Sequence, residues 1–178
     1  MLKRKGDSPS KAKGTVPLFF ETPERKWMER ALKAAYEGIG KAEGGPFGAA
    51  IVRGDRLIAV GHNTVLKEND ATCHAEINAI RAASRKLKRY DLSDCVIYST
   101  TEPCSMCFSA IHWARFRHVF FGTSFLDVAR RGFNELYIPS RKMKRDGKSP
   151  VGITSPFMRK ECLELLNAWD QRTDKKIY

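Results

Sequence analysis

Three side chains able to bind a metal or move a proton lie close together in the stretch TCHAEINAI, residues 72–80. Cys73 and His74 are adjacent, and Glu76 follows two residues after the histidine. Such a triplet often does no more than open a helix, because an acidic side chain near a helix N-terminus interacts favourably with the helix dipole. Its chemistry therefore depends on which other ligands the chain supplies.

A second group of ligands lies in TEPCSMC, residues 101–107, where Cys104 and Cys107 follow Pro103. Proline suits the first turn of a helix, and thiolates three residues apart on that turn can share a tetrahedral metal ion. The N–H groups of a helix start also lower thiol pKa values. With His74 as a third ligand from another helix start, the pattern is that of a catalytic zinc site with one open position.

Cys73 is the one nearby candidate for a fourth ligand, which would close the site as in structural zinc centres. Because Cys73 is adjacent to His74, the backbone would need an awkward bend for both to reach one ion, so we expect Cys73 to be buried beside the site. Glu76 then gains another role. A carboxylate beside water activated by zinc can take a proton and later give it to a leaving group.

The order H-x-E followed by P-C-x-x-C resembles the signature of zinc-dependent nucleobase deaminases. From about Trp27 to the C-terminus, the chain resembles the cytidine/deoxycytidylate deaminase superfamily. The resemblance implies an α/β protein with a three-layer α/β/α fold and a mixed central sheet. It also implies Zn²⁺ held by His74, Cys104 and Cys107, with Glu76 as the proton shuttle in hydrolytic release of ammonia from a cyclic amidine.

Within that superfamily, CHAEINAIR and EPCSMCFSAI look like the branch shared by bacterial tRNA adenosine deaminases and guanine deaminases. The stretches GGPFGAAIV, WARF and DVARRGFNE and the ending LLNAWDQRTDKKIY are similar to the small bacterial guanine deaminases. This resemblance implies conversion of guanine to xanthine. It also implies a homodimer whose subunits exchange their C-terminal segments.

The same resemblance implies five contacts to a purine base. Asn63 would bond the base, Phe47 would stack on it, and the backbone N–H of Ala75 would meet its carbonyl group. Asp127 would read the amino and ring N–H groups of guanine, and Tyr178 would close the site of the other subunit. Simpler roles exist for four of them: Phe47 as a core residue, Asn63 as a turn cap, Asp127 as a helix cap and Tyr178 as a frayed terminus.

Apolar periodicity predicts alternating strands and helices around these motifs. We expect helices near residues 23–37, 75–87, 104–116 and 156–169, a hairpin over 46–63, short strands at 95–100 and 118–124, and a helical turn at 127–131. Residues 139–156 are polar and contain three prolines, which predicts a long loop. Helices should cover both faces of the sheet, and the two strands that precede helices should lie parallel.

Length and composition favour one domain, with a disordered basic arm at residues 1–16 and a single deaminase domain at residues 17–178. No apolar run is long enough to span a membrane, and the basic N-terminus lacks the apolar region of a secretory signal. We therefore expect a cytoplasmic protein without membrane partners. Five cysteines in such a chain favour metal ligands and core residues over disulfides, with Cys95 and Cys162 in the core.

The net charge of +12 is concentrated in the arm and in residues 141–148, which suits anions such as nucleic acid, although basic loops are usually only solvated. Three hypotheses stay open: a free-purine deaminase, a tRNA adenosine-to-inosine deaminase, and a non-enzymatic zinc or nucleic-acid-binding module. Glu76 argues against the last, because a structural site needs no shuttle carboxylate. The basic stretch SRKMKRDGKSPVG would also allow a pocket for a nucleoside, a triazine or another aminated heterocycle.

Overall fold

The computed structural model describes residues 22–134 and 136–178, so the predicted disordered arm at residues 1–16 lies outside the described residues. The described chain forms a five-stranded sheet in the order β2-β1-β3-β4-β5. Its strands are β1 (Gly48–Arg53), β2 (Arg56–His62), β3 (Val96–Thr101), β4 (His118–Thr123) and β5 (Gly152–Thr154). β1 is antiparallel to β2 and β3, whereas β3, β4 and β5 are parallel, which confirms the mixed sheet and the predicted parallel pair.

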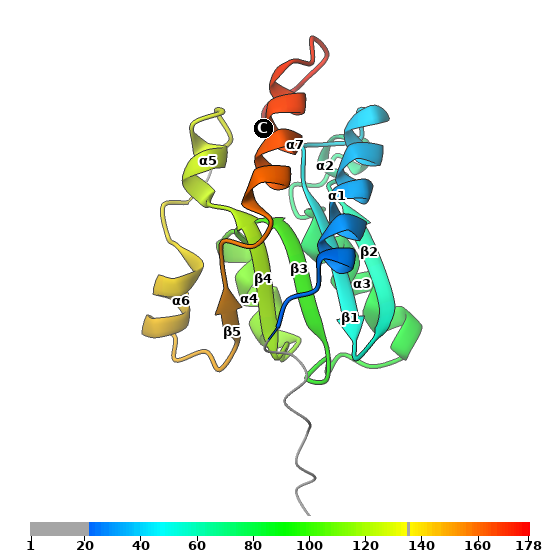
Figure 1. Cartoon of the computed structure of the whole chain (residues 1–178), viewed down its shortest axis with the longest axis vertical. Helices are drawn as coiled ribbons and strands as arrows, with labels where there is room; N and C mark the ends of the chain where they lie inside the picture. Colours follow the sequence, from blue (N-terminus) through cyan, green and yellow to red (C-terminus); the bar gives the residue numbers. More distant parts are fainter. Residues whose placement is uncertain (1–21, 135) are drawn as a thin grey trace, which may run out of the picture.

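Helices cover both faces of the sheet and give the three predicted layers (Figure 1). One face carries α1 (Arg25–Gly40) and α7 (Arg159–Asp170), and the other carries α3 (Ala75–Leu87) and α4 (Ser105–Trp113). Three shorter helices lie in the connections: α2 (Val65–Glu68), α5 (Phe125–Ala129) and α6 (Ser140–Asp146). None of the helices in the described residues is both long and apolar enough to cross a membrane.

Successive residues of the central strands point into two separate cores. In β3, Val96 and Tyr98 belong to the core under α1 and α7, while Ile97 belongs to the core under α3 and α4. Every residue of β3 is buried, because both faces of the sheet are covered. Because β3 and β4 are parallel, their carboxyl ends lie at the same edge of the sheet, where α4 and α5 begin.

The prediction of a long loop over residues 139–156 is wrong. Residues Ser140–Asp146 form α6, and Gly152–Thr154 form β5, which pairs with β4. The backbone N–H of Ser140 donates to the Glu102 carboxylate at 2.8 Å, and the Ser140 hydroxyl donates to the Pro103 carbonyl at 2.8 Å. These tertiary contacts fix a helix and a strand that are too short for local periodicity to reveal.

Candidate active site

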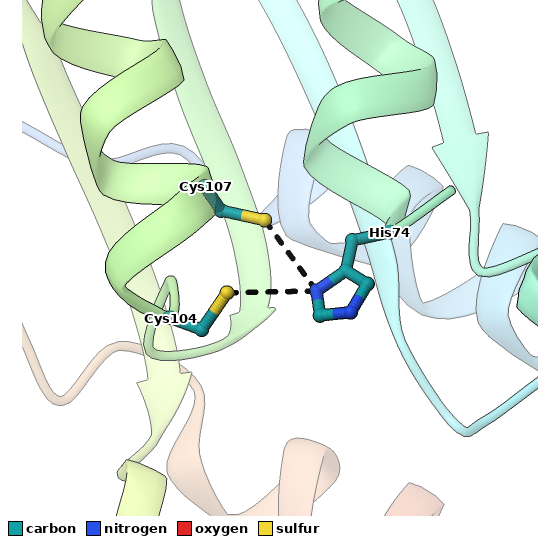
Figure 2. A group of neighbouring side chains, drawn as sticks. All are labelled: His74, Cys104 and Cys107. Carbon is teal, nitrogen blue, oxygen red and sulfur yellow. Dashed lines mark hydrogen bonds between the residues drawn. The ribbon is translucent and has the colours of Figure 1, made fainter. Parts of the chain in front are cut away.

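His74, Cys104 and Cys107 meet at the starts of two neighbouring helices, with their side chains directed toward one another (Figure 2). His74 is the N-cap of α3, Cys104 is the N-cap of α4, and Cys107 lies in the first turn of α4. Their ligand atoms all lie within 4.8 Å of one another. His74 Nδ1 lies 3.6 Å from each of the two sulfur atoms.

The spacing of these donors fits zinc. Tetrahedral zinc with bonds of about 2.3 Å to sulfur and about 2.0 Å to nitrogen places neighbouring ligand atoms roughly 3.6 Å apart. An imidazole and two thiolates are also donor types that zinc prefers. Three protein donors are one fewer than a closed structural site uses, so the geometry is that of a catalytic centre.

The pKa values of the two thiols shift in opposite directions. Hydrogen bonding from Cys107, reinforced by His74, lowers the pKa of Cys104 to about 4. The same contact with Cys104, together with burial, raises the pKa of Cys107 well above its ordinary value. A metal ion held by His74, Cys104 and Cys107 would bind both sulfur atoms as thiolates, because metal ligation displaces a thiol proton.

Cys73 is buried beside this centre, as predicted, and is not among its ligands. Its Sγ lies 3.4 Å from Asp70 Oδ2 and 3.6 Å from a guanidinium nitrogen of Arg81. These contacts are to residues outside the His74–Cys104–Cys107 cluster, so Cys73 does not close the site as a fourth ligand.

Glu76 lies in the first turn of α3, and its side chain reaches the metal ligands. The residue is only 6% exposed. Its Oε1 accepts a hydrogen bond from the Ser99 hydroxyl at 3.1 Å, and its Oε2 lies 3.5 Å from the sulfur of Cys107. Burial, followed by the nearby Cys104, raises the pKa of Glu76 above its ordinary value. A carboxyl group with a raised pKa can both accept and release a proton, as an acid–base shuttle must.

Two pockets that share Phe47, His74 and Cys104 form a cavity beside the metal ligands. Its inner end is lined by Phe47, His74, Glu76, Ser99, Thr101, Glu102 and Cys104. Its outer part is lined by Phe47, Ala71, His74, Cys104, Ser105, Met106, Phe133, Asn134, Leu136 and Tyr178. Apolar walls around a few convergent polar groups are typical of a small-molecule site. The rings of Phe47 and Phe133 meet edge to face, with centroids 5.0 Å apart, and form one wall.

Four of the five predicted substrate contacts lie at or next to this cavity. Phe47 and Tyr178 line it. Asn63 is directly behind them: its backbone N–H donates to the Phe47 carbonyl at 3.0 Å, and its Oδ1 accepts from the Tyr178 hydroxyl at 2.6 Å. Ala75 separates His74 from Glu76 and begins α3, so its N–H has no acceptor within the helix. In the single chain, Tyr178 reaches the site of its own subunit.

Asp127 has other partners in the structure, and its role in reading guanine stays a prediction. Its Oδ2 accepts from the backbone N–H and the hydroxyl of Ser124, both at 2.8 Å, which forms a capping box for α5. Both carboxylate oxygens also bind the Arg159 guanidinium, at 2.7 and 2.9 Å. This guanidinium holds the pKa of Asp127 well below its usual range. Asp127 is not among the residues that line the cavity.

Sequence reasoning missed Ser99, Thr101 and Glu102 at the inner end of the cavity. Ser99 and Thr101 alternate along β3 just before the PCxxC motif, and that spacing of two residues could have placed them on one side. Glu102 accepts from the backbone N–H groups of Phe125 at 3.2 Å and Ser140 at 2.8 Å. Glu102 thereby holds the starts of α5 and α6 next to the site. These contacts join residues far apart in the sequence, so no local pattern predicts them.

A three-layer α/β/α domain with a His–Cys–Cys centre and an adjacent buried carboxyl group is the arrangement of zinc-dependent deaminases. The profile described as the cytidine and deoxycytidylate deaminase zinc-binding region matches residues 21–123. The chain belongs to this family, which confirms the predicted superfamily, the fold class and a hydrolytic deaminase with zinc as its cofactor.

Individual relatives point to two substrate classes. The chain is 41% identical to the guanine deaminase of Bacillus subtilis (strain 168) over 155 residues, which cover 85% of this chain and 97% of that protein. It is 37% identical to the tRNA-specific adenosine deaminase of Buchnera aphidicola subsp. Schizaphis graminum (strain Sg) over 142 residues, covering 79% and 89%. The solved guanine deaminase from Nitrosomonas europaea matches with a TM-score of 0.74 at 28% identity, covering 92% and 98%.

Proposed function

We propose that this protein deaminates a purine base, converting guanine and water to xanthine and ammonia. The observation that carries the proposal is the position of Glu76, buried beside the His–Cys–Cys centre at the inner end of an apolar-walled cavity. The similarity of nearly the whole chain to guanine deaminases supports guanine as the base.

The residues of the site have separable tasks in this reaction. When bound by His74, Cys104 and Cys107, zinc supplies a Lewis acid that activates water for attack on the ring carbon bearing the amino group. Glu76, held at Oε1 by Ser99, takes up a proton at its other oxygen and delivers it to the amino group, which leaves as ammonia. The raised pKa of Glu76 suits both halves of this transfer.

The proposed substrate contacts are Phe47, Asn63, Ala75 and Tyr178. Phe47 stacks against the base, the Ala75 N–H meets its carbonyl group, and the side-chain amide of Asn63 donates to the base. Tyr178 covers the outer cavity. A role for Asp127 in reading the amino and ring N–H groups of guanine stays a prediction, and its carboxylate oxygens would have to exchange contacts with Ser124 or Arg159 to fulfil it.

We also propose a cytoplasmic homodimer that exchanges C-terminal tails. Residues 173–177 are exposed, and the tail turns back beside α7 (Figure 1). Tyr178, at its end, lines the outer cavity. Such a tail can bind the equivalent site of a second subunit at a low cost in free energy, because exchanged tails make the same contacts. The five cysteines are free thiols, which fits a reducing compartment.

A tRNA adenosine-to-inosine deaminase is the second candidate, favoured by the net charge of +12 and by the tRNA-specific relatives. Such an enzyme would have nucleic acid as its partner, and its affinity for tRNA would fall steeply with salt. A nucleoside or another aminated heterocycle, such as a triazine, is the third.

Ammonia release from a panel of substrates separates these candidates. The panel contains guanine, guanosine, adenine, cytosine, cytidine, an aminated triazine and a tRNA with adenosine at the wobble position. We expect turnover of guanine and no salt-sensitive shift of tRNA in a binding gel. Turnover of tRNA alone would keep the zinc chemistry and overturn the proposed substrate.

A further inference from the structure

The side-chain amide of Asn63 is held in one orientation. Its Oδ1 accepts from the Tyr178 hydroxyl at 2.6 Å, the Val65 N–H at 3.1 Å and the Gly45 N–H at 3.3 Å. An amide flipped by 180° would turn its NH₂ group toward two backbone N–H donors, which cannot accept a hydrogen bond. The donors around Asn63 therefore assign its oxygen and its nitrogen unambiguously.

The nitrogen of the same amide, unlike its oxygen, lacks a hydrogen-bond partner in the described part of the chain. Asn63 is 1% exposed, and its Nδ2 has no hydrogen-bond partner among residues 22–134 and 136–178. A buried NH₂ group left unpaired is destabilising, so we expect a bound ligand to supply its acceptor. Asn63 adjoins Phe47 and Tyr178, which both line the cavity.

Tyr178 completes this arrangement from the far end of the sequence. Its hydroxyl donates to Asn63 Oδ1 and accepts from the Gly45 N–H at 3.0 Å. Its ring packs edge to face on Phe133, with centroids 5.6 Å apart. One hydroxyl group thus joins the C-terminal tail, the Gly45 loop and the Asn63 amide.

We propose that Tyr178 is a positioning residue that sets substrate specificity by locking the Asn63 amide with its NH₂ group toward the ligand. The site then accepts a heterocycle that presents a ring-nitrogen acceptor to Asn63 and rejects one that presents a C–H or N–H group there. This proposal rests on the proposed deamination of a purine base, and it assigns Tyr178 a role beyond covering the cavity.

The first test is made on the ligand-free, zinc-loaded protein by ¹⁵N NMR. The Asn63 NH₂ signals are identified by their loss in Asn63→Asp and are then followed in Tyr178→Phe, which keeps the ring and removes the hydroxyl. We expect these signals to shift and broaden, with the melting temperature unchanged. Tyr90→Phe, at a tyrosine that is 71% exposed, is the matched control and should leave them in place. Unchanged Asn63 signals in Tyr178→Phe would overturn the proposal.

The second test measures kcat/KM for guanine, 3-deazaguanine and 7-deazaguanine. For the wild-type enzyme, kcat/KM should be about tenfold or more lower for one deaza analogue than for guanine. That analogue has a C–H group in place of the ring nitrogen and leaves the Asn63 NH₂ group unpaired. Tyr178→Phe should reduce this preference for guanine over the analogue to about threefold. In an Asn63→Asp background, Tyr178→Phe should change the preference little, because both changes act on the same contact. Equal ratios in wild type and Tyr178→Phe, or no discrimination by the wild type, would overturn the proposal. If guanine is not a substrate, the proposed function fails, and the NMR test still decides the role of Tyr178.

Discussion

Neighbouring groups decide whether a buried thiol of this chain has a raised or a lowered pKa, since burial alone raises it. Cys95 and Cys162 are buried in the two cores, as predicted, and burial raises the pKa of each thiol to about 12. Cys104 is partly buried, yet contacts with Cys107 and His74 favour its thiolate. Two thiols are thus suited to packing and two to binding a metal, because only the second pair lies together with a histidine at helix starts.

Thiol alkylation should distinguish these two groups. In metal-free protein we expect iodoacetamide to modify Cys104 first, because it is only partly buried, while Cys95 and Cys162 stay unmodified. Zinc should protect Cys104 and Cys107 by ligation. Peptide mapping by mass spectrometry reads out each position. Equal labelling of Cys104 with and without zinc would contradict the assignment of the metal ligands.

At the scale of elements, helix starts were the most predictable parts of the site. The helix expected over residues 75–87 is α3 with the same bounds, and the PCxxC motif opens α4 as expected. Capping and apolar periodicity are local properties, which is why the sequence carries them. α6 and β5 were missed because Glu102, Pro103 and β4 hold them in place.

In the loop before β1, the backbone of Gly44 packs closely against Asn63. A Cβ atom on Gly44 would lie 2.1 Å from Asn63 Oδ1 and 2.6 Å from the Asn63 carbonyl oxygen. We expect Gly44→Ala to raise KM and to lower the free energy of unfolding by about 1–3 kcal/mol, with zinc content unchanged. Gly40→Ala is the control, because nothing lies within 4 Å of its Cβ, and it should be neutral or slightly stabilising. Equal effects of both changes in denaturant melts would refute this account of the loop.

Asp127 should act on stability through α5 and α7. We expect Asp127→Asn to lower the free energy of unfolding at pH 7 by about 1–2 kcal/mol. Because Arg159 depresses the pKa of Asp127 in the folded state, this stabilisation is full above the ordinary aspartate pKa of about 3.9 and is lost as pH falls further. Urea melts of both proteins should therefore converge in acid.

The exposed Asp146 in α6 provides the control for Asp127, since its carboxylate is also ion-paired, in its case with Lys142 and Arg145. Asp146→Asn should change stability little, as is usual for exposed ion pairs. A large loss of guanine turnover in Asp127→Asn without a loss of stability would restore the predicted role of Asp127 in reading the base.

At the scale of the whole molecule, the site draws on segments far apart in the described chain, from Phe47 to Tyr178. The motifs around His74 and Cys104 were sufficient to predict the family, the zinc cofactor and the fold class, and the structure brings the three proposed ligands together beside Glu76. The other cavity walls were less accessible to sequence reasoning, because Phe133 and Leu136 reach the cavity from a segment well beyond the metal motifs. The sequence also showed no sign of the contact between Asp127 and Arg159, because the two residues lie 32 positions apart.

Mixing two inactive variants tests the proposed exchange of tails. One variant carries Glu76→Gln with an intact Tyr178, and the other carries Tyr178→Ala with an intact Glu76. After the mixed subunits are unfolded and refolded together, exchanged tails should restore about one wild-type site in each mixed dimer, because Tyr178 from one chain meets Glu76 of the other. No gain in activity over the separate variants would show that each tail serves its own subunit.

The most direct measurement of the central claim compares xanthine formation by wild-type protein and Glu76→Gln, both loaded with zinc and checked for metal content. The account predicts equal zinc content, an unchanged fold and a fall in kcat of about 10²–10⁴-fold, because the shuttle carboxyl is lost while the ligands remain. Undiminished xanthine formation by Glu76→Gln at full zinc occupancy would contradict the assignment of Glu76.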